Sequence, residues 1–246
     1  MSSKRVLLAV EPSSEWPGLF QDCFEEMPVR ILTADNPLDA AHQLDSGCDL
    51  VLVEPKLASK AFVQKLHSLR ELQPALRVYA LGQPAGADAA FCDHFFPKGI
   101  SLEELEREMV RTLPLPDPID VLVADDETEI GAMVQDFLAY RSAPAFKVTY
   151  VQNGEEALKF LKHQRPHIVV LDVKMPVKDG IEVYREIQAR KLDLPVIVFF
   201  DAVSGHEIEA LHAIGRPSIV EKASRQSALP ELLTLLKKMV YFWGAQ

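Results

Sequence analysis

Residues 167–180 read HIVVLDVKMPVKDG, and this stretch decides how the chain is organised. Its residues 168–171 form a short, unbroken and mostly β-branched apolar run, typical of a strand buried on both faces of a parallel sheet. Asp172 ends the run, and the Met-Pro and Asp-Gly pairs at 175–176 and 179–180 indicate a turn before a helix. Because open α/β sheets bind ligands at the carboxyl ends of their strands, we expect Asp172 to lie at a functional edge.

Two more predicted strands, 121–124 and 218–221, are followed directly by charged residues. The first is followed by Asp125 and Asp126, and the second by Lys222. We expect the first, third and fifth strands of a doubly wound sheet to be neighbours. Their ends would then bring these two acids, Asp172 and the lysine into one cleft.

Taken alone, Asp172 reads as a strand-terminating aspartate or a helix cap. Three clustered carboxylates, however, cannot all ionise without a large free-energy cost. Mg²⁺ relieves that repulsion and prefers oxygen ligands. A lysine opposite the metal would hold a transferred phosphoryl group by its charge. Asp172 is therefore a plausible nucleophile, because carboxylates accept phosphoryl groups as aspartyl phosphates.

Four motifs carry a resemblance to the receiver (CheY-like) domain of bacterial two-component response regulators: Asp125-Asp126, the loop DVKMPVKDG at 172–180, Lys222, and NGEEAL at 153–158, which opens the second helix. The resemblance covers about residues 117–243. It implies a flavodoxin-like (βα)5 fold, which is a doubly wound α/β domain with a parallel five-stranded sheet in the order 2-1-3-4-5.

The resemblance also implies phosphoryl transfer and the residues that would take part in it. A sensor histidine kinase or phosphotransfer protein would donate a phosphoryl group to Asp172, and Lys222 would stabilise the new charge. Mg²⁺ would be held by Asp126, Asp172 and the backbone carbonyl of Lys174, with Asp125 contacting it through water. Such a domain assists its own phosphorylation and dephosphorylation, but it is a signalling module that alters binding to a downstream protein, here unidentified.

Three positions depart from the pattern of that family. Phe200 stands where receivers carry Thr or Ser, although a gap in the alignment would place Asp201 or Ala202 there. Ile219 replaces the aromatic switch residue, and Ala223 replaces the proline after the lysine. The usual coupling from phosphate to a partner-binding face is thus in question.

One alternative function follows from these departures, and a second comes from enzymes that are built on a similar α/β sheet. A phosphorylation-independent scaffold would keep its partner when Asp172 is replaced by Asn. A Mg²⁺-dependent phosphohydrolase would need a second acid two residues after its nucleophile, and Asp172 is followed by Val173-Lys174, so that spacing fails.

Composition sets further bounds. A chain of 246 residues has room for two domains, and its net charge of −10 argues against a general nucleic-acid binder without excluding a local basic patch. No apolar run is long enough to span a bilayer, and the start lacks a signal-peptide pattern. The three cysteines are widely spaced, which suggests neither a disulfide framework nor a metal site. We expect a cytoplasmic protein without membrane insertion.

The first half of the chain repeats the second in order and in residues. Residues 6–9, 49–53 and 96–98 align with 121–124, 167–171 and 220–222. In the first copy we expect strands at 6–10, 29–32, 50–53, 77–81 and 95–96, and helices at 16–26, 36–44, 62–72 and 102–112. In the second we expect the fourth strand at 196–199 and the last helix at 229–243. The predicted domains are a degenerate receiver at 1–113, a proline-rich linker at 114–118 and a phosphorylatable receiver at 119–246.

The first copy lacks most of the residues on which phosphoryl transfer would depend. Val10-Glu11 stands in place of the acid pair, Glu54 in place of the phosphoacceptor, and Lys98 remains. We expect Glu54 and Lys98 to form an ion pair in a structural or partner-binding pseudo-receiver. The alternative is that Glu54 imitates a charged, switched-on state.

The end of the chain is aromatic. Residues 241–243 (Tyr-Phe-Trp) extend beyond the usual last helix of the family and are a candidate contact with the first domain or with a second chain in a homodimer. No output domain follows in this sequence, so we expect the output to be binding.

Overall fold

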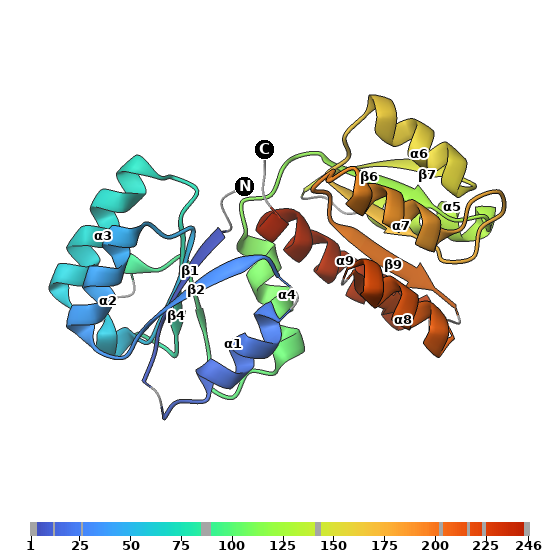
Figure 1. Ribbon diagram of the computed structural model, residues 1–246. Helices are drawn as coiled ribbons and strands as arrows, with labels where there is room; N and C mark the ends of the chain where they lie inside the picture. Colours follow the sequence, from blue (N-terminus) through green and yellow to red (C-terminus); the bar gives the residue numbers. More distant parts are fainter. Residues whose placement is uncertain are drawn as a thin grey trace. The chain divides into compact units, whose positions relative to one another are not determined.

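The computed structural model describes residues 4–11, 13–25, 27–84, 90–140, 144–201, 204–215, 217–222 and 225–243, with side chains of the last segment described from 228. The chain divides into two compact units, Met1–Pro114 and Leu115–Gln246, and each has its own five-stranded sheet (Figure 1). None of the helices in the described part combines the length and apolar character that crossing a membrane requires.

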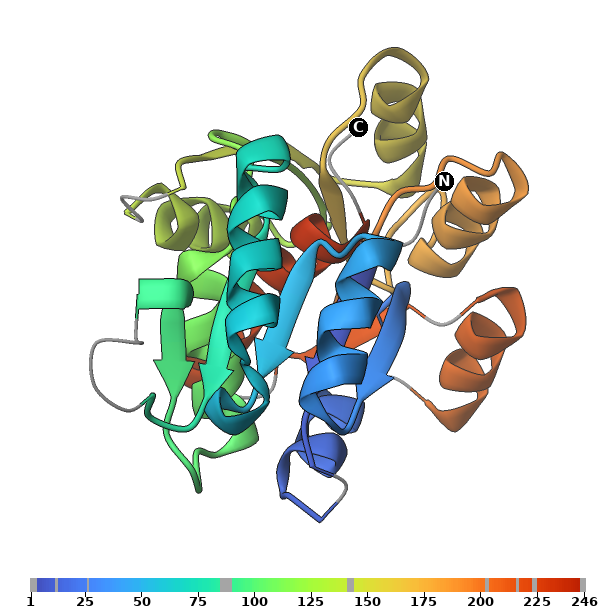
Figure 2. The same cartoon turned by 90° about the vertical axis from the view of Figure 1, so that its left-hand side faces the viewer.

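The first unit is a three-layer α/β sandwich. Its parallel strands lie in the order β2-β1-β3-β4-β5 and are β1 (Lys4–Ala9), β2 (Val29–Ala34), β3 (Leu50–Val53), β4 (Arg77–Leu81) and β5 (His94–Phe96). Its helices are α1 (Trp16–Phe24), α2 (Pro37–Gln43), α3 (Lys60–Leu72) and α4 (Leu102–Thr112), with 3-10 turns η1 (Leu44–Ser46) and η2 (Pro55–Leu57). Figures 1 and 2 show α2 and α3 side by side over one face of the sheet, and Figure 1 shows α1 and α4 over the other.

The second unit repeats this plan. Its parallel strands lie in the order β7-β6-β8-β9-β10 and are β6 (Ile119–Ala124), β7 (Phe146–Val151), β8 (Ile168–Leu171), β9 (Val196–Phe200) and β10 (Ser218–Glu221). Its helices are α5 (Thr128–Ala139), α6 (Gly154–His163), α7 (Gly180–Ala189), α8 (Gly205–Ile214) and α9 (Arg225–Trp243).

The predicted strand order 2-1-3-4-5 is confirmed in both units. The predicted bounds are also confirmed for β3, β4, β8, β10 and α4. The fourth strand of the second unit runs one residue further than predicted, through Phe200. Residue 26, the predicted end of the first helix, lies outside the described residues.

One expectation about neighbouring strands was wrong. β8 pairs with β6 and β9, so the third strand does not touch the fifth, because β9 lies between them. Of the first, third and fifth strands, only the first and third are adjacent in an order of 2-1-3-4-5. A residue after the fifth strand reaches the site only if its side chain spans that extra strand.

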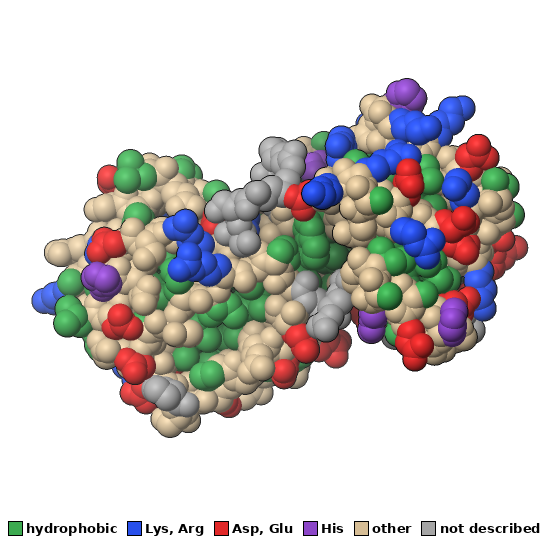
Figure 3. Space-filling model, viewed as in Figure 1, with side chains coloured by type: hydrophobic (Ala, Val, Ile, Leu, Met, Phe, Trp, Pro, Cys, Tyr) green, Lys and Arg blue, Asp and Glu red, His purple; other side chains and the backbone are tan. Residues whose placement is uncertain are grey.

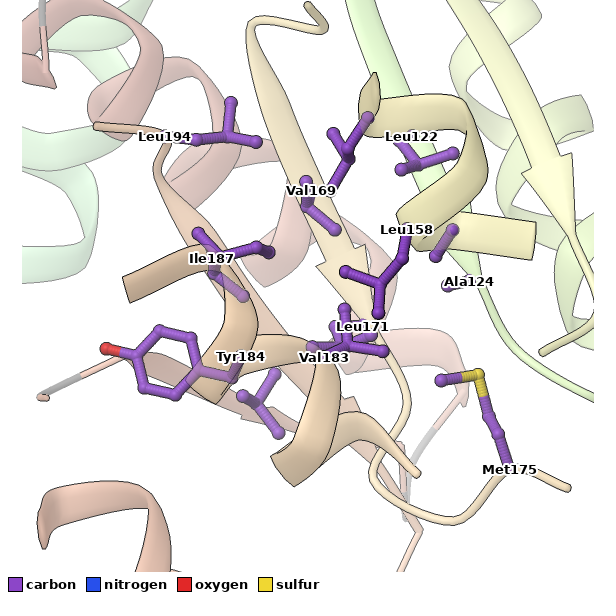
Figure 4. Close-up of a cluster of buried hydrophobic side chains, with 14 of the residues drawn as sticks. Leu122, Ala124, Leu158, Val169, Leu171, Met175, Val183, Tyr184, Ile187 and Leu194 are labelled. Carbon is purple, nitrogen blue, oxygen red and sulfur yellow. The ribbon is translucent and has the colours of Figure 1, made fainter. Parts of the chain in front are cut away.

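Burial on both faces explains why every residue of β8 is apolar. All four of its residues are buried, as expected for a central strand with helices on both faces. Figure 4 shows Val169 and Leu171 on one face, packed with Leu158 of α6 and with Val183 and Ile187 of α7. Each such side chain contributes roughly 2 kcal/mol through removal from water. The strand that carries Asp172 is therefore firmly held.

Positive charge gathers on one face of the second unit. Figure 3 shows Lys and Arg side chains over α6 and α7, where the charged lining of a groove of about 450 Å³ consists of Lys159, Lys162, Lys178 and Arg190 together with Glu155 and Glu186. Arg190 is paired with Glu186 of the same groove. This is a local basic patch of the kind that the net charge did not exclude.

Candidate functional site

Three charged residues follow directly on strands β6, β8 and β10. The backbone N–H of Asp172 donates to the carbonyl of Ala124 (2.8 Å), and that of Asp125 donates to Val151 (3.1 Å). The backbone N–H of Lys222 donates to the last residue of β9 (2.6 Å). Each residue therefore continues the hydrogen-bonding register of its sheet by one position, which fixes its side chain at the carboxyl edge.

Lys222 joins the two acids. Its Nζ lies 2.7 Å from Oδ2 of Asp125 and 2.8 Å from Oδ1 of Asp172. The other oxygen of Asp172 accepts the backbone N–H of Lys174 (2.7 Å), and that of Asp125 accepts the N–H of Glu127 (3.0 Å). The three charged residues are at most 7 % exposed. The long lysine side chain thus bridges the strand that separates β10 from β8.

Burial and the charges of the three neighbouring groups together shift the pKa values of the site, which carries one more negative than positive charge. Burial raises the pKa of Asp125, with Asp172 adding repulsion, while Lys222 opposes the shift. Burial alone would lower the pKa of Lys222, but its hydrogen bonds and ion pairs with the two carboxylates outweigh that effect and raise it. A buried pocket with excess negative charge favours protons or cations.

Asp126 lies apart from this buried group. Its side chain is exposed, whereas its neighbour Asp125 is buried. Among the described residues, no three acidic, His or Cys side chains are already gathered as a metal ligand set. The carboxylate oxygens and the excess negative charge nevertheless suit a hard divalent cation.

Aromatic residues of β9 border the lysine. The ring centroid of the buried Phe199 lies 5.5 Å from Nζ of Lys222, within the range of a cation–π contact. Phe200 is the last residue of β9, half-buried and opposite Glu221. It brings an aromatic ring and no hydroxyl to the strand end. Ala202 and Ala223 lie outside the described residues.

The turn after Asp172 is held by its own hydrogen bonds. Asp179 caps α7, because its carboxylate accepts the N–H of Glu182 (2.7 Å) and its own N–H donates back to that side chain (3.1 Å). Val177 is 74 % exposed and has a positive φ of 68°, which is strained for a β-branched residue.

The degenerate site of the first unit is arranged differently from the prediction. Glu54 is buried and accepts the backbone N–H of Glu11 (2.7 Å). Its nearest cation is Lys56, at 3.8 Å, which also pairs with Glu11 at 2.5 Å. The expected ion pair between Glu54 and Lys98 was therefore wrong, since Lys98 is exposed and a lysine two residues after Glu54 is closer.

Two residues near the second site were missed from the sequence. Phe199 reads as an ordinary core residue of a strand, and its place beneath Lys222 depends on tertiary packing. Tyr150 belongs to β7, yet its hydroxyl donates to the backbone carbonyl of Asp125 (2.7 Å). No local motif marks either residue, because both contacts cross between strands.

The second unit has the fold and the acids and lysine at the strand ends that the resemblance to a receiver domain implies. Residues 121–234 match the profile of the response regulator receiver domain. The second unit is a receiver domain homologous to those of two-component response regulators, a family whose role is phosphorylation-based signalling. Receiver domains bind Mg²⁺ and interact with histidine kinases or phosphotransfer partners in general.

Curated relatives match this half of the chain. The probable C4-dicarboxylate response regulator DctR of Bacillus subtilis (strain 168) is 30 % identical over 118 residues, which are 48 % of this chain and 52 % of that protein. The response regulator MprA of Mycobacterium sp. (strain KMS) is 32 % identical over 123 residues, 50 % of this chain and 51 % of that protein. The chain thus spans about half the length of the curated relatives it matches.

Among solved structures, the response regulator domain of Thermotoga maritima CheB is 27 % identical, with a TM-score of 0.44, and the match covers 50 % of this chain and 96 % of that one.

Proposed function

We propose that the second unit accepts a phosphoryl group on Asp172 from a sensor histidine kinase or phosphotransfer protein and signals by a change in protein binding. The observation that carries this proposal is the buried Asp172, fixed at the end of β8 with one oxygen 2.8 Å from Nζ of Lys222. A nucleophile with a cation beside it is the arrangement that phosphoryl transfer needs.

The proposed step is an in-line displacement. A carboxylate oxygen of Asp172 forms a bond to the phosphorus of a donor phosphohistidine, and the phosphorus–nitrogen bond breaks with its electron pair left on the imidazole. Lys222 leaves its ion pair with the carboxylate and compensates the charge of the phosphoryl oxygens. Asp126, Asp172 and the carbonyl of Lys174 would hold Mg²⁺, with Asp125 contacting it through water. The ion would neutralise charge on the transferring group.

The rest of the chain would convert this event into binding. The acyl phosphate adds charge and acceptor oxygens to the cleft and so shifts a conformational population. The first unit would act as a pseudo-receiver that binds or supports a partner, and a homodimer is a further candidate. We place the protein in the cytoplasm, as a signalling module rather than a metabolic enzyme, without direct nucleic-acid binding.

Intact mass after incubation with acetyl phosphate and Mg²⁺ tests the proposal. We expect one phosphoryl adduct on the wild type and none on the Asp172→Asn variant, because an amide is not a nucleophile for this transfer. The variant should fold, since it removes one of two mutually repelling carboxylates. An adduct that persists in the variant would place the acceptor elsewhere. If the folded wild type accepts no phosphoryl group from either acetyl phosphate or a cognate kinase, the proposal is contradicted.

A phosphorylation-independent scaffold is the second candidate. Phe200 favours it, because the strand end that usually offers a hydroxyl to the phosphate carries an aromatic ring. Partner binding that is unchanged by Asp172→Asn, and by acetyl phosphate in the wild type, would favour this scaffold over the phosphorylated switch.

A further inference from the structure

The acidic turn between β6 and α5 is held at its first residue by the neighbouring edge strand. The backbone N–H of Asp125 donates to the carbonyl of Val151 (3.1 Å), which ends β7. The backbone carbonyl of the same residue accepts the hydroxyl of Tyr150 (2.7 Å), also from β7. Both backbone groups of Asp125 are therefore bonded to one strand, one through the main chain and one through a side chain.

The ring of Tyr150 can reach the turn because the residue of α5 that it packs against, Gly131, has no side chain. A Cβ on Gly131 would collide with Cε2 and Cδ2 of Tyr150 and would lie 2.7 Å from its Cζ. Any other residue at this position would push the ring, and the hydroxyl with it, away from the turn. Glycine in a helix interior lowers helix stability relative to alanine. At this position that cost accompanies the close approach of an aromatic ring.

We propose that Tyr150 is a positioning residue for the acidic turn, holding the peptide between Asp125 and Asp126 in the orientation from which the two acids engage a divalent cation. The inference about the cation rests on the function proposed above. The clamp itself, formed by Tyr150 and Gly131, rests only on the contacts of the second unit.

The physical argument concerns the peptide plane. The carbonyl of Asp125 and the N–H of Asp126 belong to one rigid planar unit, so a bond to the carbonyl also fixes where the next residue starts. Asp126 is exposed and receives little restraint from packing. Without the hydroxyl, the backbone of Asp125 keeps only its N–H bond to Val151, and its carbonyl, which fixes the next peptide plane, is released. Ordering the turn around a cation then costs more conformational entropy.

Tyr150→Phe tests the clamp, because it keeps the ring and removes only the hydroxyl. We expect faster amide hydrogen exchange in residues 125–131, measured by mass spectrometry on the full chain. We also expect the dissociation constant for Mg²⁺, measured by calorimetry, to rise about threefold to tenfold, which corresponds to one hydrogen bond. The phosphorylation rate at saturating Mg²⁺ should stay near that of the wild type. Tyr184→Phe, on α7 and away from the turn, is the matched control and should change none of these.

Gly131→Ala is the complementary variant, because it keeps the hydroxyl and displaces the ring. It should weaken Mg²⁺ binding as Tyr150→Phe does, whereas adding Gly131→Ala to Tyr150→Ala should have little further effect, since the ring is already gone.

Unchanged hydrogen exchange and unchanged Mg²⁺ affinity in Tyr150→Phe would overturn the proposal, as would a lower melting temperature with unchanged Mg²⁺ affinity. A wild type that binds no Mg²⁺ would overturn the proposed function, while the exchange comparison would still decide the clamp.

Discussion

Lys222→Met is expected to lower the free energy of unfolding of the second unit by about 3 kcal/mol at neutral pH, because it removes one partner from a buried ion-pair group. Asp125 and Asp172 would then face each other without the cation that now lies 2.7 and 2.8 Å from their oxygens. The loss of that cation should also slow phosphorylation at Asp172, on the order of a hundredfold, as for removal of one charge-stabilising donor. Urea denaturation and the time course of the phosphoryl adduct measure the two effects.

The stability loss should depend on pH in a defined direction. The folded-state pKa of Asp125 is already raised by burial, so its ionisation opposes folding as pH rises through that pKa. Lys222 lowers this pKa, and its removal raises the pKa further. The deficit of the variant should therefore be largest at neutral pH and shrink as pH falls toward the ordinary carboxylate range of about 4.

A second substitution gives the control for this prediction. Adding Asp172→Asn to Lys222→Met removes one of the two unpaired carboxylates and should recover much of the lost stability at neutral pH. If Lys222→Met is as stable as the wild type, or if its deficit does not change with pH, the ion pairs do not hold the site together as described.

Patterns confined to one strand or one turn predicted the fold well. The apolar runs of β3 and β8 each end at an acidic residue, and their predicted bounds are confirmed. Asn36 opens the helix predicted at 36–44, and its side chain accepts the N–H groups of Leu38 and Asp39, so it caps the observed helix. Such features depend on neighbours within a few residues, so the sequence alone displays them.

Contacts between distant segments were predicted less well. The sequence placed Asp125, Asp172 and Lys222 in one cleft, but it did not show that β9 separates β10 from β8 or that Phe199 lies beneath the lysine. Glu54 pairs with Lys56 rather than Lys98, because a buried carboxylate takes the nearest flexible cation. Side-chain partners are decided by geometry at the scale of single ångströms, which residue types alone do not specify.

The turn that follows Asp172 depends on a glycine for a steric reason. Gly180 begins α7, and a Cβ there would collide with the backbone oxygen of Asp172 and come within 3.0 Å of its carbonyl carbon. Neither atom can rotate away, because both belong to the backbone that extends β8. The N–H of Gly180 also donates to the carbonyl of Val173 (2.9 Å), which keeps the helix start pressed against the strand end.

Gly180→Ala should therefore lower the free energy of unfolding by roughly 2–3 kcal/mol, as for an overpacked interior, and slow phosphorylation by displacing Asp172 from Lys222. Gly205→Ala is the matched control, since α8 also begins at a glycine but a Cβ there meets no atom within 4 Å. That control should leave stability unchanged or raise it by up to about 1 kcal/mol through lower entropy of the unfolded chain. Urea denaturation and adduct formation compare the two. Equal stability of both variants would mean that the turn can shift to admit a methyl group, and the strand end would then not fix the phosphoacceptor as rigidly as its hydrogen bonds indicate.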